Sequence, residues 1–228
     1  MSGMASVGLA VFVKTPGLSP IKTRLAASIG TAAALDFFHA ALAAVVASVD
    51  AARDTPIQPY FAVAETAGLA HWARHPAAWP VLAQGEGELG TRMALIHDQL
   101  LARHAGGILL GADAPWVTPA SLRAAATWLA AAAPRACLGP AEDGGFYLYG
   151  ANRPLSLAAW TQPRYGGPEA TRDLLAQCPP QWSWQQLPTT PDLDRASDLE
   201  RLLASLPAGA HAQQVALHAM LRACIPTS

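Results

Sequence analysis

Basic residues gather in one short segment near the start of this chain. The sequence holds 15 lysines and arginines together but only two lysines, Lys14 and Lys22, with Arg24 two residues after the second. A lysine amine binds phosphate oxygens as a point charge, and an arginine guanidinium can bind them through two parallel hydrogen bonds. Pro16 and Gly17 give the segment a defined turn. This pattern favours a phosphate-binding loop over a solvated basic loop, although it lacks the spacing of a P-loop.

Two carboxylates follow apolar runs of the sequence. Asp113 comes shortly after the apolar residues 107–111, and Asp143 precedes Gly144 and Gly145 between two further apolar runs. Either aspartate could instead serve structure alone, because aspartate caps turns and Asp-Gly is a common hairpin turn. The two together fit a divalent cation such as Mg²⁺, which takes one or two carboxylates and shares phosphate oxygens. The sequence therefore suggests a phosphate and metal site.

A third glycine-rich segment leads into a predicted helix. Its glycines would let a base or a sugar approach the backbone closely, and its arginine could contact a phosphate. Acidic residues within the segment would repel phosphate, so the base and the ribose are the better candidates. The signal is weak by itself. The nucleotide-binding candidates here are Gln84, Gly85, Gly90 and Arg92.

Apolar runs alternate with longer helical patterns, which predicts an α/β fold with a mostly parallel central sheet flanked by helices. Ligands of such sheets bind at the carboxyl ends of the strands, where the basic segment and both aspartates would lie. Thr118 followed by Pro119 is a typical helix start. We expect strands at residues 7–13, 59–64, 107–111, 136–139, 146–150 and 182–187, and helices at 31–50, 65–74, 91–104, 119–133, 168–177, 195–206 and 209–223.

Composition excludes several classes of protein. The chain has 228 residues, of which 52% are hydrophobic and 14% charged, so we do not expect disorder. A net charge of −1 argues against nucleic-acid binding and against an anionic membrane surface. The first apolar run is too short for a membrane span. The three cysteines lack metal-ligand spacing, which favours a reducing, cytoplasmic location. With no visible boundary, we expect one domain over residues 1–228.

Five segments taken in order resemble a known family. They look like the bacterial DUF2064 group of glycosyltransferase-A-like proteins, in the nucleotide-diphospho-sugar transferase superfamily. The resemblance runs from about residue 7 to residue 203, and five ordered motifs are far more specific than any one of them. The segments that carry it are residues 13–25, 84–93, 111–115, 139–147 and 192–199.

The resemblance implies a single Rossmann-like GT-A domain, a nucleotide-activated donor, and Mg²⁺ or Mn²⁺ as cofactor. The basic residues of the first segment would lie along the phosphates, Asp113 and Asp143 would bind the metal, and the residues after Asp143 would line the acceptor side. Residues 160–167, which include Tyr165, depart from the family's usual pattern where the acceptor pocket is shaped. The acceptor-side candidates are Gly144, Gly145, Tyr147 and Tyr165, and the catalytic candidates are Lys22, Asp113 and Asp143.

Two reactions fit these features, and both transfer a group from a nucleotide to a small-molecule acceptor. Family labels favour glycosyl transfer from a nucleotide-sugar, whereas the cluster of basic side chains suits a nucleoside triphosphate and nucleotidyl transfer with release of pyrophosphate. No general base is evident. The same features also fit a non-catalytic nucleotide-binding relative, and a plain interaction domain would leave the basic loop without a role. The last helix has no motif match, and we interpret it as a packing or oligomer surface.

Overall fold

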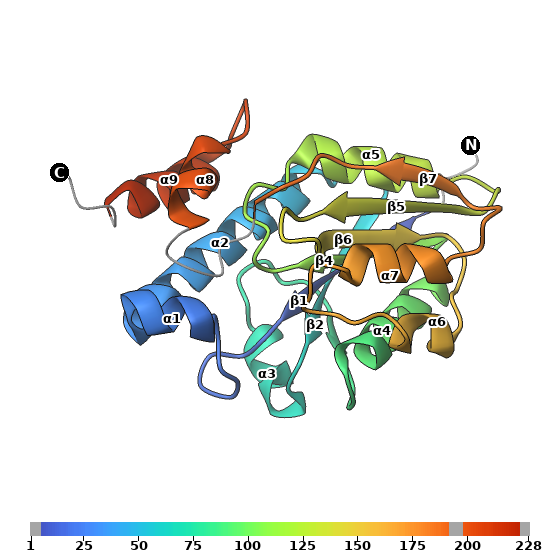
Figure 1. Cartoon of the computed structure of the whole chain (residues 1–228), viewed down its shortest axis with the longest axis horizontal. Coiled ribbons are helices and arrows are strands. Elements are labelled where there is room, and N and C mark those ends of the chain that lie inside the picture. Colours follow the sequence, from blue (N-terminus) through green and yellow to red (C-terminus); the bar gives the residue numbers. More distant parts are fainter. Residues whose placement is uncertain (1–5, 192–197, 224–228) are drawn as a thin grey trace.

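A seven-stranded sheet forms the centre of the protein (Figure 1). The computed structural model describes residues 6–191 and 198–223. Strand β6 runs antiparallel to its neighbours β4 and β5, and the other neighbouring strands pair in parallel. The predicted mostly parallel α/β sheet is therefore confirmed. In the order β3-β2-β1-β4-β6-β5-β7, the strands span Val81–Ala83, Ile57–Val63, Val7–Val13, Gly106–Gly111, Phe146–Ala151, Arg135–Pro140 and Ser183–Gln186.

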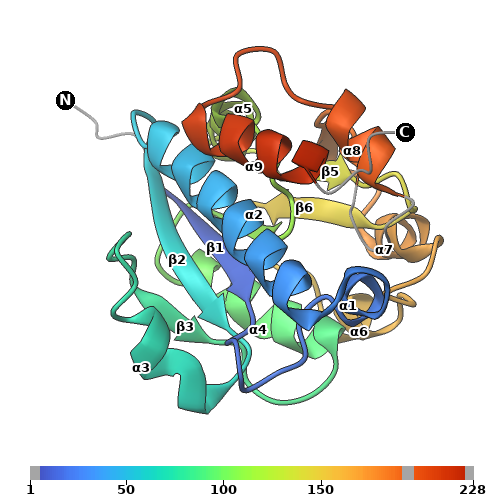
Figure 2. The same cartoon turned by 90° about the vertical axis from the view of Figure 1, so that its left-hand side faces the viewer.

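Helices cover both faces of the sheet, as Figures 1 and 2 show. Helices α2 (Thr31–Ala51) and α5 (Pro119–Leu129) contribute to the core on one face. Helices α4 (Leu89–Leu101), α6 (Leu157–Thr161) and α7 (Ala170–Gln177) contribute to the core on the other. The 3₁₀ turn η1 (Thr66–Gly68) and helix α3 (Leu69–Trp72) connect β2 to β3.

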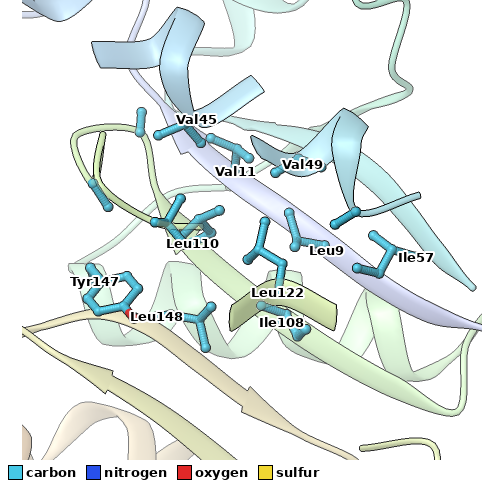
Figure 3. Packing of buried hydrophobic residues seen from close by; sticks show 14 of the residues in the cluster. Leu9, Val11, Val45, Val49, Ile57, Ile108, Leu110, Leu122, Tyr147 and Leu148 are labelled. Carbon is cyan, nitrogen blue, oxygen red and sulfur yellow. The ribbon is translucent and has the colours of Figure 1, made fainter. Parts of the chain in front are cut away.

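Strand β1 shows why the first apolar run has no polar position. Leu9 and Val11 belong to the core beneath α2 and α5, where Val45 and Val49 of α2 meet them (Figure 3). Ala10 belongs to the core on the opposite face. A strand covered on both faces is apolar at every position, which is typical of parallel sheets.

A third apolar cluster lies outside α2. It joins α2 to α1 (Thr23–Ile29), α8 (Leu199–Ala204) and α9 (Ala212–Ala223). Figure 2 shows α9 lying along α2. The expected packing role of the last helix is confirmed. Helix α2 is also long and apolar enough to cross a bilayer by length and composition alone, with 50% of its most apolar window buried inside the protein.

Some elements differ from the prediction for local reasons. The predicted cap of α5 is confirmed, because the Thr118 hydroxyl accepts a hydrogen bond from the Ser121 N–H at 3.1 Å. Helix α5 ends at Leu129 rather than at residue 133, and in the segment after it the Asn152 Nδ2 donates to the carbonyls of Ala131 and Ala133 at 2.8 Å each. The sequence does not predict strand β3 or helices α1 and α6, because three to seven residues are too few to show periodicity. Residues 195–197 of the predicted helix 195–206 lie outside the described residues.

Candidate functional site

A pocket of about 380 Å³ opens at the carboxyl ends of β1, β4 and β5. This is the edge of an open α/β sheet at which ligands bind. Six of the predicted site residues line it, although they come from four separate segments of the sequence. These six are Arg24, Asp113, Asp143, Gly145, Tyr147 and Tyr165.

An ion pair joins the basic segment to the first aspartate. The Lys22 Nζ lies 2.9 Å from the Asp113 Oδ2, and the Lys22 side chain is only 7% exposed while that of Asp113 is 47% exposed. The Lys22 amine holds the pKa of Asp113 below its usual value, an effect larger than the opposing one of burial. Asp113 is therefore a carboxylate at neutral pH, with its charge facing the pocket.

The backbone of Lys22 is strained. Its φ of 45° and ψ of 47° lie in the left-handed region, at the residue that precedes helix α1. A side chain other than glycine or asparagine costs about 1 kcal/mol there. Strained backbone of this kind gathers at functional sites, where the surrounding structure holds it in place. Here the left-handed backbone of Lys22 directs its nearly buried amine to Asp113.

This strain predicts an order of stability among variants that all lack the amine. We expect Lys22→Gly to be more stable than Lys22→Ala by about 1 kcal/mol, because glycine adopts positive φ without steric cost. Urea unfolding of the two variants measures the difference. At Lys14, which is outside the left-handed region, the matched pair Lys14→Gly and Lys14→Ala should show no advantage for glycine. Equal stability of the two Lys22 variants would show that the left-handed backbone is not held in solution.

The chain between the two lysines is anchored by Thr15. The Thr15 N–H donates to the Glu65 Oε2 at 2.8 Å, and the Trp72 Nε1–H donates to the Thr15 Oγ1 at 3.0 Å. Gly68 leaves room for this contact, since a Cβ on it would lie 2.0 Å from the Thr15 Oγ1. The segment is thus a loop with a defined shape, as its composition predicts. Lys14 itself is exposed and donates to a backbone carbonyl of this loop.

Pro16 and Gly17 shape the same loop without reaching the pocket. Gly17 has a φ of 84°, which glycine adopts readily. Pro16 lines a different hollow, between α2 and the segment around α3. Their part in nucleotide binding stays a prediction.

The turn that carries Asp143 is fixed to the start of α7. The Thr171 Oγ1–H donates to the Gly145 carbonyl at 2.7 Å, and the Thr171 N–H donates to the Gly144 carbonyl at 3.1 Å. Gly144 has a φ of 88°, and a Cβ on it would lie 2.0 Å from the Pro168 carbonyl oxygen. Asp143 accepts the Gly145 N–H at 2.9 Å and lines the pocket. The turn is a β5–β6 hairpin, and it also brings a carboxylate to the pocket.

The four predicted residues of the glycine-rich segment, Gln84, Gly85, Gly90 and Arg92, do not line the pocket, although Leu89 of the same segment does. The Gln84 Nε2–H donates to the Ala62 carbonyl at 2.8 Å, and the Arg92 Nε–H donates to the Gly87 carbonyl at 2.8 Å, so both side chains hold local structure. Gly90 allows α4 to approach α6, since a Cβ on it would lie 2.1 Å from the carbonyl oxygen of Trp160. Gly85 has a φ of 75° in the turn before α4. The part of these residues in base or ribose binding stays a prediction.

Both predicted tyrosines line the pocket with their hydroxyls already engaged. The Tyr147 O–H donates to the Pro188 carbonyl at 3.0 Å, and the Tyr165 O–H donates to the Trp160 carbonyl at 2.8 Å. Burial raises the pKa of each phenol well above its usual value. Both are therefore neutral near pH 7, and neither is suited to act as a general base.

Several pocket residues escape prediction from the sequence. They are mostly apolar, and in the sequence they look like ordinary core residues on strands and helices. The exception is an exposed leucine within the glycine-rich segment, which is a weak signal of a binding surface. These residues include Phe12, Leu89, Met93, Phe146 and Thr190.

The carboxylates of the pocket limit the kind of cation it could hold. Within residues 6–191 and 198–223, no three histidine, cysteine or acidic side chains are grouped as a complete metal site. Asp113 and Asp143 supply hard oxygen ligands, so they fit a cation such as Mg²⁺ that takes its remaining ligands from phosphate and water. The acidic residues at 192 and 194 of the fifth family-like segment lie outside the described residues.

Solved structures show the same fold. A protein from Desulfovibrio desulfuricans G20, whose assignment as a nucleotide-diphospho-sugar transferase is itself provisional, superposes with a TM-score of 0.77 at 20% identity, over 96% of this chain and 98% of that one. Rv0371c from Mycobacterium tuberculosis H37Rv gives 0.51 at 18% identity, over 87% and 98%. The CMP:2-keto-3-deoxy-manno-octonic acid synthetase, solved with CTP, gives 0.53 at 11% identity, over 86% and 96%.

The family is shown by the sequence. No curated protein matches this chain. A family model described as an uncharacterized protein conserved in bacteria, DUF2064, matches residues 45–166, which is more than half of the 228 residues. The matched part includes Asp113 and Asp143 of the pocket and ends just after Tyr165. The chain therefore belongs to the DUF2064 family.

Proposed function

We propose that this protein is a metal-dependent transferase that takes a group from a nucleotide-activated donor and passes it to a small-molecule acceptor. The observation that carries the proposal is the convergence of Asp113, Asp143 and Arg24 on one pocket at the carboxyl ends of the strands, with the Lys22 amine bonded to Asp113. Glycosyl transfer from a nucleotide-sugar, within a single GT-A domain, is the form we favour.

The charged side chains would bind a polyphosphate in two ways, directly and through a metal ion. Arg24 and Lys22 bind phosphate oxygens, the first through a planar pair of donors and the second as a point charge. Asp113 and Asp143 would hold Mg²⁺ or Mn²⁺, which supplies positive charge beside the leaving phosphate. The Lys22 amine, now on Asp113, would then exchange a carboxylate oxygen for a phosphate oxygen. Lys22 would then face a phosphate and Asp113 the metal ion, so each would still lie beside a group of opposite charge.

Positioning and electrostatics account for the chemistry that these residues can do. The two tyrosines of the pocket stay neutral and hold backbone carbonyls, so we assign them to shape rather than to proton transfer. The cationic side chains stabilise the negative charge that develops on the departing nucleoside diphosphate. Thr171 and Gly144 keep the Asp143 turn rigid, which limits the motion of one carboxylate relative to the other.

Nucleotidyl transfer is the second candidate. It is favoured by the concentration of the chain's two lysines and Arg24 in one segment, since a triphosphate carries more charge than a nucleotide-sugar. Of the solved structures described above, the two with the highest TM-scores carry names of different kinds. One is named a nucleotide-diphospho-sugar transferase, and the other is the CMP:2-keto-3-deoxy-manno-octonic acid synthetase solved with CTP. The likeness to both supports a nucleotide-dependent transferase in general.

Product analysis with labelled donors tests the proposal and separates the two reactions. Nucleotide-sugars and nucleoside triphosphates are incubated with the protein, Mn²⁺ and a mixture of small alcohols and phosphates. Release of a nucleoside diphosphate means glycosyl transfer, and release of pyrophosphate means nucleotidyl transfer. Nucleotide affinity without turnover, unchanged by metal or by Asp113→Asn, would mean a non-catalytic relative. Absence of nucleotide affinity would leave an interaction domain.

A further inference from the structure

Two chemically different groups of side chains line the pocket. The charged group, called the charged end, is Arg24, Asp113 and Asp143. The apolar group, called the apolar end, comes from β1, the first turns of α4, the start of β6 and the segment before α7, and most of it belongs to or packs against one core cluster. Its side chains are Phe12, Leu89, Met93, Phe146 and Tyr165.

The apolar end is the open edge of a core cluster. Met93 belongs to the apolar core between the sheet and α4, and it is 5% exposed. Phe12, Phe146 and Tyr165 pack against that core but are only partly buried. The rings of Phe146 and Tyr165 meet edge to face with their centres 6.3 Å apart. The core therefore continues into the pocket as a surface that a ligand can cover.

Few hydrogen-bonding groups are offered to a ligand at this end. The hydroxyl hydrogen of Tyr165 is used by the Trp160 carbonyl, so the side chain presents its ring to the pocket. The other four side chains of the apolar end have no strong hydrogen-bonding group. A bare sugar or polyol placed here would lose its bonds to water without replacement, which is unfavourable. An apolar group would instead gain by leaving water.

Leu89 marks the mouth of the apolar end. It is the first residue of α4, and it is 46% exposed although it lines the pocket. Leu95, on the same helix, is 43% exposed but does not line the pocket. The two leucines are thus a matched pair, alike in type, helix and exposure and different in their relation to the pocket.

We propose that the acceptor of this transferase is amphipathic, with a polar head at Asp113 and Asp143 and an aliphatic or aromatic body over the apolar end. This inference rests on the proposed function, because it names the chemical class of the acceptor. The charged end binds the group that reacts, and the apolar end selects molecules that carry a hydrophobic body. Each methylene that the pocket buries strengthens binding about four-fold.

The test uses straight-chain alcohols from ethanol to hexanol as probes, with glycerol as the polar counterpart. Saturation-transfer NMR titration of the unmodified protein gives the dissociation constants without nucleotide or metal. We expect the constant to fall by about two- to four-fold for each added methylene, and glycerol to show no saturable binding. A series without dependence on chain length would overturn the proposal.

Variants locate the probe. Leu89→Ser should weaken hexanol binding about ten-fold or less, in line with partial burial of one leucine, and Leu95→Ser should leave it unchanged. Met93→Gln provides a second change inside the pocket and should also weaken hexanol binding. Equal effects of the two leucine variants would mean general surface binding and would overturn the proposal.

A nucleobase is the competing occupant of the apolar end. In that case nucleoside triphosphates would displace hexanol, and Leu89→Ser would weaken nucleotide binding; either result overturns the assignment to the acceptor. Additive thermal shifts from hexanol and nucleotide support it. Failure of the proposed function would look different. No nucleotide would then shift the Tm, whereas the alcohols would still bind with the expected dependence on chain length.

Discussion

Replacing Asp113 with asparagine is expected to lower kcat/KM for the transfer by at least about 100-fold, the usual cost of removing one group that stabilises charge in the transition state. The neutral amide is a poor ligand for a hard cation, and it leaves the nearly buried Lys22 amine without the carboxylate that it contacts at 2.9 Å. The rate is measured as release of nucleotide product under Mn²⁺ saturation of the parent protein.

Two controls separate this effect from folding. Asp36→Asn removes a charge from an exposed position of α2, away from the pocket, and should leave the rate unchanged. The double variant Asp113→Asn with Lys22→Met removes both charges of the ion pair. If Asp113 serves only to neutralise Lys22, the double variant regains nucleotide binding with metal. The proposed function predicts that binding stays lost, because both the metal ligand and the phosphate contact are gone.

The second large effect concerns acid stability and His97. Its ring is fully buried on α4, near Tyr149 and Trp160, with ring centres 5.8 and 5.7 Å away. Burial lowers the pKa of His97 from 6.5 to about 4 in the folded protein. The unfolded chain therefore takes up a proton first as the pH falls. The contribution of His97 to the free energy of unfolding should be complete above pH 6.5. As the pH falls from 6.5 to 4, this group alone should lower the free energy of unfolding by roughly 3 kcal/mol.

His97→Phe should flatten that decline, because phenylalanine keeps an aromatic ring in the core without a titrating nitrogen. Urea unfolding at pH 7 and at pH 4.5 gives the two free energies for each protein. His39→Gln, a change at an exposed position of α2, is the matched control and should decline as steeply as the parent. If His97→Phe also declines as steeply, the buried imidazole is not the source of acid sensitivity.

The parts of the fold that the sequence predicts are those with strong local patterns. Strand β1 is predictable because all seven of its residues are apolar or glycine, and α5 because Thr118 and Pro119 start it. Strand β3 and helix α6 escape prediction because their form depends on neighbours. Residues 81–83 become a strand by pairing with β2, and α6 is a single short helix packed on α4.

The charged end of the site could be predicted, and the apolar end could not. Asp113 and Asp143 line the same pocket because they follow strand ends at the same edge of the sheet, and this rule needs no side-chain detail. That α4 can approach α6 only because Gly90 has no side chain is also not visible in the sequence. Phe12 and Met93 look like core residues in the sequence, and one side of each does pack in the core. Only the three-dimensional packing shows that their other side faces a pocket.

One thermal-shift experiment tests the shared site of cation and polyphosphate most directly. Nucleoside triphosphates and nucleotide-sugars are added with and without Mn²⁺ to the parent protein, Lys22→Ala and Asp113→Asn. A ligand at 100 times its dissociation constant adds about 2.7 kcal/mol, which raises the Tm of a chain of this length by roughly 5–10 °C. We predict such a rise with Mn²⁺ in the parent protein and its loss in both variants. An equal rise in Lys22→Ala and Asp113→Asn would contradict the account, as would no rise with any nucleotide.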